Sequence, residues 1–290
     1  MTGAKPIEGF EERFLDAKAV RMRYFVGGEG PPIVLVHGLA GTAWNWSELA
    51  PLLAERRRVL LPDLPGHGGS SPLPAAASLD PYAERVRLVA AAEGMLPAPI
   101  VGHSLGGLVA LRLALRSPEN VEALVLAAAA GIASATRRAE FWLTVFGFLR
   151  PARRISPHHE RIARSPALAR AVFGCLEVSD PASLSPRSVA GFLAGQRLHS
   201  DVRSAGRVLV RDDPRPDLER VSCPSLVLWG ARDRQVPVED AFEYTRRLRA
   251  TLRVIPDCGH LLIAERAAAC ADAIESFLVG SDPGVFDPET

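Results

Sequence analysis

Short continuous apolar runs alternate with segments of helical spacing along most of this chain. Strands are expected at 14–15 and 20–26, paired as an antiparallel hairpin, and at 33–36, 58–62, 99–101, 121–126, 225–229 and 251–255. Helices are expected at 82–95, 105–116, 238–249 and 264–279. Because alternating strands and helices pack as a layered structure, the sequence predicts an α/β fold with a mostly parallel central sheet flanked by helices.

The alternation stops after Gly131 and resumes near residue 220. Between these points the sequence predicts no strand, and six prolines separate short pieces of helical character. We therefore expect a core in two parts, 1–131 and 220–280, with a helical cap at 132–219 inserted after the sixth core strand. Residues 281–290 are expected to form a loose tail.

Composition excludes several classes of protein. Of the 290 residues, 48% are hydrophobic and 23% are charged, which is typical of a globular chain. The 34 basic and 33 acidic residues nearly cancel, so net charge favours binding neither to nucleic acid nor to an anionic membrane. The chain lacks a long apolar run and an apolar signal segment at its start, so we expect a cytoplasmic protein without stable membrane insertion, either monomer or dimer.

The four cysteines show no spacing typical of a metal site or a disulfide framework. They are Cys175, Cys223, Cys258 and Cys270. Reduced thiols are therefore expected, with no metal and no organic cofactor.

The strongest chemical signal is the segment Gly102-His103-Ser104-Leu105-Gly106-Gly107 between an expected strand and an expected helix. A serine in such a sharp turn needs glycine neighbours, and the turn exposes its hydroxyl at the carboxyl edge of the sheet. The amide end of the following helix would face developing negative charge. We interpret Ser104 as a nucleophile.

A serine nucleophile needs a base, and His260 is the expected one. It follows the last expected strand, which brings it to the same sheet edge as Ser104. His37 and His67 are interpreted as groups that shape loops, whereas His103 should point away from the nucleophile. Solvated positions in the cap are expected for the remaining histidines, which are His158, His159 and His199.

The base needs an acid that orients it, and Asp233 follows the strand at 225–229 at the same edge. The edge position after 121–126 offers no carboxylate. The sequence order Ser104, Asp233, His260 is the nucleophile, acid, base order of this architecture. We interpret Asp212, Asp213 and Asp217 as a solvated run of charged residues.

The loop His37-Gly38-Leu39-Ala40-Gly41 directly follows the buried strand at 33–36. A glycine-containing loop there can direct backbone N–H groups towards the oxygen of a substrate near Ser104. The backbone amides of Leu39 and Leu105 are the expected oxyanion hole.

Together these motifs, the turn at 63–70 and Glu265 after Gly259-His260 make the chain resemble the α/β-hydrolase superfamily, in its group with a helical cap, from about residue 12 to 280. The elbow Gly-His-Ser-Leu-Gly resembles that of carboxylesterases and lipases. Epoxide hydrolases and haloalkane dehalogenases of the superfamily carry aspartate where Ser104 stands. Hydrolases of carbon–carbon bonds typically carry asparagine at His103 and tryptophan at Leu261, and cofactor-free haloperoxidases an aromatic residue before the nucleophile.

The resemblance implies a serine hydrolase that cleaves carboxylic esters through an acyl-enzyme, with a small apolar ester as substrate. Alternatives on the same triad are a C–C bond hydrolase or an acyltransferase, and a ligand-binding receptor of the same fold remains open. Residues expected to bind substrate are Trp44, His103, Phe141, Trp142, Phe146 and Leu261. The apolar segment 139–149 could equally be a cap helix packed on the core, and Trp44 could pack beneath the loop. The basic early cap is either a solvated face or a site for an acidic group.

Overall fold

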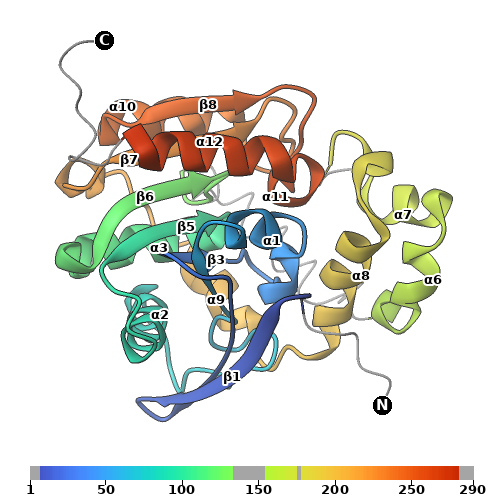
Figure 1. The fold of residues 1–290 in the computed structure, drawn as a ribbon, viewed down its shortest axis with the longest axis horizontal. Coiled ribbons are helices and arrows are strands. Elements are labelled where there is room, and N and C mark those ends of the chain that lie inside the picture. Colours follow the sequence, from blue (N-terminus) through green and yellow to red (C-terminus); the bar gives the residue numbers. More distant parts are fainter. Residues whose placement is uncertain (1–6, 133–153, 175–177, 281–290) are drawn as a thin grey trace.

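A twisted sheet of eight strands forms the centre of the protein (Figure 1). The computed structural model describes residues 7–132, 154–174 and 178–280. The strands are β1 (Phe10–Ala17), β2 (Val20–Gly27), β3 (Pro32–Val36), β4 (Arg58–Pro62), β5 (Ala98–His103), β6 (Val121–Ala127), β7 (Ser225–Gly230) and β8 (Thr251–Ile255). They lie in the order β1-β2-β4-β3-β5-β6-β7-β8.

The strand pairing confirms the expected mostly parallel sheet. β2 pairs antiparallel with both β1 and β4, and every other pair is parallel. The central strands are buried along nearly their whole length, because helices cover both faces of a parallel sheet. The carboxyl ends of the parallel strands therefore meet at a single edge.

Helices of the core flank this sheet, with α1 packed against α12 and α2 packed against α3. They are α1 (Leu49–Ala54), α2 (Asp80–Ala92), α3 (Leu105–Arg116), α10 (Val238–Leu248), α11 (Leu262–Glu265) and α12 (Ala267–Gly280), and the short 3-10 helices are η1 (Ala43–Trp46) and η2 (Pro118–Asn120). The short α1 was not expected from periodicity, because six residues span less than two turns. The expected last helix is divided at Arg266, whose φ of −137° is not helical.

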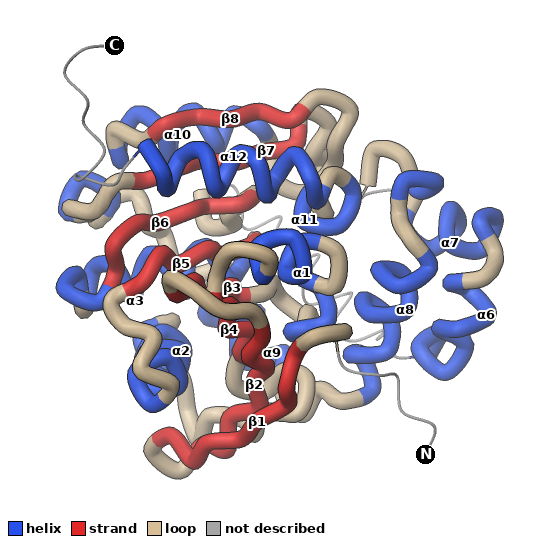
Figure 2. Tube along the Cα trace, in the orientation of Figure 1, coloured by secondary structure: helices blue, strands red, loops and turns tan. Residues whose placement is uncertain are grey.

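Between β6 and β7 the described residues form helices and turns, and residues 154–174 and 178–220 contain no strand (Figure 2). These elements are η3 (Ser156–His158), α6 (His159–Ala163), α7 (Pro166–Phe173), η4 (Pro181–Ser183), α8 (Pro186–Ala194), η5 (Gly195–Arg197), α9 (Val202–Leu209) and η6 (Leu218–Arg220). We call residues 154–174 and 178–220 the helical insertion. Its helices α6, α7 and α8 lie beyond the arrowheads of β6 and β8 in Figure 1.

The helical insertion has its own small apolar core. Phe173 and Phe192 contact each other edge to face there, with ring centroids 6.1 Å apart. Leu261, which directly follows His260, is buried in this same cluster. The loop that carries His260 therefore packs against the helical insertion.

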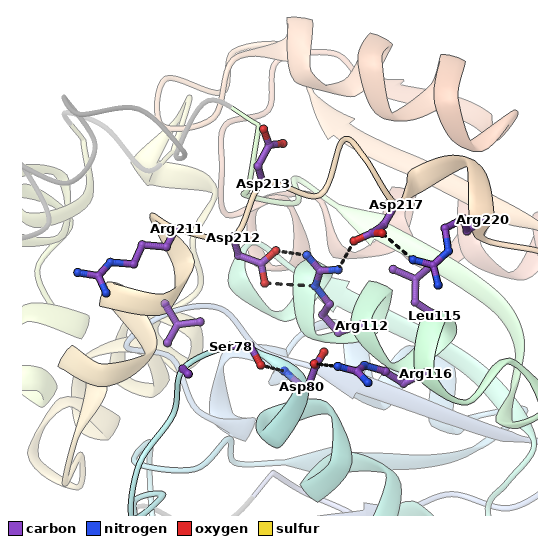
Figure 3. Close-up of a pocket in the computed structure, with 12 residues that line it drawn as sticks. Ser78, Asp80, Arg112, Leu115, Arg116, Arg211, Asp212, Asp213, Asp217 and Arg220 are labelled. Carbon is purple, nitrogen blue, oxygen red and sulfur yellow. Dashed lines mark hydrogen bonds and ion pairs between the residues drawn. The ribbon is translucent and has the colours of Figure 1, made fainter.

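Where the chain returns from the helical insertion to the core, two aspartates bind one arginine of α3 (Figure 3). Arg112 forms a two-pronged ion pair with Asp212 and a second ion pair with Asp217 at 2.7 Å. The interpretation of these aspartates as a solvated charge run was therefore wrong for Asp212, which is 8% exposed. The partners are 100 residues apart in sequence, so no local pattern indicates the pairing.

These ion pairs line a cavity of about 570 Å³. Its acidic groups are already paired with arginines, since Asp80 binds Arg116 and Asp217 also binds Arg220. None of the residues predicted to be catalytic lines this cavity. We interpret it as a polar joint between α3 and the end of the helical insertion.

Replacing Arg112 with leucine is expected to lower the free energy of unfolding by about 3 kcal/mol, because Asp212 would remain buried without its cation. Urea unfolding followed by circular dichroism measures this change. Arg116→Leu is the matched control, since its ion pair lies at an exposed arginine and should cost less than about 1 kcal/mol. Equal losses for both variants would contradict the prediction.

No helix in the described part of the chain is both long and apolar enough to cross a bilayer. Within the same residues, no three histidine, cysteine, aspartate or glutamate side chains group in a way that could hold a metal ion.

Candidate active site

Each of the three predicted catalytic residues lies just after the carboxyl end of a strand. Ser104 follows β5, Asp233 follows β7 within three residues, and His260 follows β8 within five. These strands are parallel members of one sheet, with β6 between β5 and β7. The topology therefore brings all three residues to the carboxyl edge of the sheet, as predicted.

Ser104 occupies a strained turn between β5 and α3. Its φ of 54° lies in the left-handed region, which costs a non-glycine residue about 1–2 kcal/mol. Its amide donates to Ala127 O at 3.0 Å, and its carbonyl accepts from Ala130 N at 3.1 Å. These bonds to the end of β6 hold the turn in place.

The neighbouring glycines allow this turn to pack closely. A Cβ added to Gly102 would lie 2.2 Å from the carbonyl oxygen of Gly106, and one on Gly106 would lie 2.1 Å from that of Val36. A Cβ on Gly107 would lie 2.6 Å from the Cβ atom of Ala129. Backbone approaches of this kind exclude any side chain, which explains the glycine pattern around the serine.

His260 and Asp233 form a buried hydrogen-bonded pair. The imidazole Nδ1–H donates to Asp233 Oδ2 at 2.7 Å, and the side chains are 4% and 0% exposed. The other carboxylate oxygen accepts the backbone amides of Gln235 at 2.8 Å and Val236 at 2.9 Å. This arrangement places the ring proton on Nδ1 and leaves Nε2 as a base.

His103, the residue before Ser104, connects the serine turn to the His260 loop. Its Nε2–H donates to His260 O at 2.9 Å, and the two rings lie 5.0 Å apart between centroids. Burial lowers the pKa of His103 to about 3, so its ring is neutral. Within the described residues no hydrogen bond joins the Ser104 hydroxyl to the His260 ring. Such bonds are often long without substrate and shorten when substrate binds.

The loop after β3 packs directly on the serine. A Cβ on Gly38 would lie 3.0 Å from Ser104 Cβ, so only glycine gives the observed approach with an unstrained contact. Among the described residues, neither the Leu39 amide nor the Leu105 amide has a hydrogen-bond acceptor. Leu105 is the first residue of α3, whose amide has no acceptor within the helix.

A neutral histidine supports this loop from beneath. His37 is completely buried, its Nε2 accepts the amide of Leu64 at 2.9 Å, and its Nδ1–H donates to Gly38 O at 2.8 Å. Burial lowers the pKa of His37 to about 3, with smaller effects from the nearby His199 and His103. The expectation that His37 shapes a loop agrees with these bonds.

Stability is expected to fall as pH decreases from about 6.5 towards 3. In this range the unfolded chain binds a proton at His37 that the folded protein does not, which costs up to about 1.4 kcal/mol per pH unit. Glutamine does not titrate, so unfolding of the His37→Gln variant should take up one proton fewer in this range. The slope of its unfolding free energy against pH should therefore be smaller by up to about 1.4 kcal/mol per pH unit. Urea unfolding at several pH values measures the slope. An unchanged slope would contradict the neutral buried state of His37.

His199 is not a solvated cap residue, contrary to the sequence-based expectation. Its Nδ1 accepts the amide of Gly68 at 3.0 Å, and its Nε2–H donates to Ala40 O at 2.9 Å. Its ring also lies 5.5 Å from that of His67. The helical insertion therefore holds two loops of the core together through this ring, a contact that sequence spacing cannot reveal.

A buried ion pair stabilises the same two loops. Asp63 Oδ2 accepts Arg23 Nε at 2.6 Å and Gly69 N at 2.9 Å, while Oδ1 accepts Ala43 N at 2.8 Å. The Arg23 guanidinium lies 5.1 Å from the ring centre of Trp44. Asp63 was recognised only as part of a turn motif, and its partners come from separate strands and loops.

The predicted substrate-binding residues differ in their positions. Trp44 is half-buried on η1, His103 is buried beside His260, and Leu261 is buried in the core of the helical insertion. The side chain of Leu39 faces α9, because a Cβ on Gly206 would lie 3.6 Å from it. Phe141, Trp142 and Phe146 lie outside the described residues.

Comparison with known proteins agrees with this geometry. The pattern of the α/β hydrolase fold family matches residues 31–267. The chain belongs to this family. The match covers the serine turn, Asp233 and His260, and the eight-stranded, mostly parallel sheet flanked by helices is the expected fold.

Relatives in the α/β hydrolase fold family carry different activities. A dihydrolipoyllysine-residue acetyltransferase component of an acetoin cleaving system from Pseudomonas putida is 32% identical, over 95% of this chain and 71% of its own. A pimeloyl-[acyl-carrier protein] methyl ester esterase from Nitrosomonas europaea is 34% identical, and the alignment covers 85% of this chain and 96% of that protein. A crystal structure of a bacterial membrane phospholipase A aligns with a TM-score of 0.73 and 26% identity, covering 95% of this chain and 87% of that chain. The protein is therefore a hydrolase-family chain whose relatives include esterases.

Proposed function

We propose that the protein is a serine hydrolase that cleaves carboxylic esters. Ser104 Oγ attacks the carbonyl carbon while His260 Nε2 takes the hydroxyl proton. Asp233 keeps the ring in the required tautomer and stabilises its charged form, and the amides of Leu39 and Leu105 bind the oxyanion. The tetrahedral intermediate expels the alcohol, which receives the proton from His260. Water, activated by the same ring, then attacks the acyl-enzyme and releases the carboxylic acid.

The observation that carries this proposal is the buried hydrogen bond of 2.7 Å from His260 to Asp233, at the sheet edge where Ser104 occupies its strained turn. Among the described residues no hydrogen bond occupies His260 Nε2, so this nitrogen is available as a base. The relative named as a methyl ester esterase supports the choice of an ester bond.

We propose the segment 132–219 as a cap over this site. The helices α6, α7 and α8 lie beyond the carboxyl edge of the sheet, and Leu261 joins their apolar core to the His260 loop. A cap closes the site to bulk water, so a small apolar ester is the proposed substrate.

Acyl transfer is the second candidate activity. It is favoured by the relative named as an acetyltransferase component, because the same acyl-enzyme can pass its acyl group to an alcohol or thiol in place of water. Both activities share the first half-reaction and differ only in the acceptor.

Initial rates on p-nitrophenyl esters from acetate to palmitate test the proposal. Release of p-nitrophenol well above background, with an optimum at one chain length, is expected for an esterase with a defined acyl pocket. Adding an alcohol or thiol acceptor and measuring the new ester by mass spectrometry separates the candidates. A dominant transfer product identifies an acyltransferase, and no turnover of any ester contradicts the proposed function.

A further inference from the structure

Glu265 on α11 is a buried carboxylate that binds two segments of the chain at once. Its side chain accepts the backbone amide of Gly259 at 2.7 Å, one residue before His260. It also accepts the amides of Ser179 at 3.0 Å and Asp180 at 2.8 Å, which belong to the helical insertion. The residue is 4% exposed. One carboxylate therefore joins the His260 loop to the helical insertion.

Three backbone N–H groups donate to this carboxylate, and the thiol of Cys258 is a further, weaker partner. Among the described residues, no arginine, lysine or histidine forms an ion pair with Glu265. Charge-assisted hydrogen bonds of this kind are stronger than neutral ones, and no neutral side chain can accept three amides equally well. The negative charge thus has a specific use, which is to hold these amides together.

Close packing makes the same contact rigid. A Cβ on Gly259 would lie 2.8 Å from Ser179 N and from the carbonyl carbon of Val178. On its other side, a Cβ on Gly230 at the end of β7 would lie 2.3 Å from Gly259 O. The backbone before His260 is therefore held between β7 and the helical insertion, with the Glu265 carboxylate joining the layers.

We propose that Glu265 is a positioning residue that sets the place of the His260 imidazole and couples it to the position of the helical insertion. The inference rests on the proposed function, since it assigns Glu265 a part in the same site. Glu265 acts through the backbone at Gly259 and does not contact the reacting atoms.

Glu265→Gln tests this role, because the amide group would direct N–H donors at a backbone N–H. Glu93→Gln is the matched control. Glu93 is a half-buried residue whose carboxylate also has several donors, namely Tyr24, Arg13 and Arg58. Those partners belong to β1, β2 and β4, at the opposite end of the sheet from β7 and β8. Both variants should lose stability, and only Glu265→Gln should lose catalysis.

The expected result is a fall in kcat of about 10- to 100-fold for the optimal p-nitrophenyl ester, with KM changed less than about threefold. The rate at which a small fluorophosphonate labels Ser104 should fall in parallel. The low-field proton NMR signal of His260 Nδ1–H should weaken or shift in Glu265→Gln and remain unchanged in Glu93→Gln. A role limited to fold stability would leave kcat and this signal unaltered in the folded variant.

A second variant covers the case in which Glu265→Gln does not fold. Gly259→Ala keeps the carboxylate but pushes the His260 loop away from Val178 and Ser179, so it should show the same fall in kcat. Normal kcat, labelling and NMR signal in either folded variant would overturn the inference, as would an effect on KM alone. If the wild type hydrolyses no ester, the proposed function fails, and the NMR comparison still decides whether Glu265 positions the ring.

Discussion

Replacing Ser104 with alanine is expected to lower kcat/KM for the optimal p-nitrophenyl ester by ~10⁵-fold or more. In the proposed mechanism the hydroxyl forms the covalent bond to the acyl group, and no other serine lies in a left-handed turn at the end of a strand among the described residues. Circular dichroism should show an unchanged fold, because the alanine retains the Cβ that packs on Gly38. Steady-state rates and labelling by a fluorophosphonate measure the loss.

Ser117→Ala provides the control for this substitution. Ser117 follows the carboxyl end of α3, whereas Ser104 precedes its amino end, so the two lie at opposite ends of one helix. The control should keep full activity and full labelling. If Ser104→Ala kept more than a small fraction of wild-type activity, another nucleophile or a contaminating enzyme would be responsible, and the proposed mechanism would fail.

Asp233→Asn is expected to lower kcat by ~10⁴-fold with little change in stability. The asparagine oxygen can still accept the amides of Gln235 and Val236, but its NH₂ group would face His260 Nδ1. The imidazole would then carry its proton on Nε2, where it cannot act as a base towards Ser104. Rates across the pH range, together with the thermal unfolding midpoint, measure both parts of the prediction.

Asp257→Asn is the corresponding control, because Asp257 lies three residues before His260 and is exposed in an ion pair with Arg232. It should remain within about threefold of wild type, since exposed ion pairs contribute little. A loss in Asp257→Asn comparable to that in Asp233→Asn would show that general disturbance of the loop, and not the tautomer of His260, controls the rate.

Several elements could be predicted closely from the sequence because their signals are local. The bounds of β8 and α3 agree with the pattern of apolar residues, and the hairpin of β1 and β2 was expected from its two short runs. The turn at Ser104 could be located because close backbone approach demands glycine, and that demand is visible in the sequence itself. By contrast, α1 is too short to produce a periodic signal.

The order of strands and helices, the positions of Ser104, Asp233 and His260 at strand ends, and the break in alternation after residue 131 were determined by the sequence alone. Tertiary structure decided what holds these positions, because the partners lie far apart along the chain. Glu265 meets Ser179 across 86 residues, Arg112 meets Asp212 across 100, and His199 meets Gly68 across 131. Hydrogen bonds and ion pairs of this range depend on how layers pack, whereas periodicity reports only neighbours within a few turns.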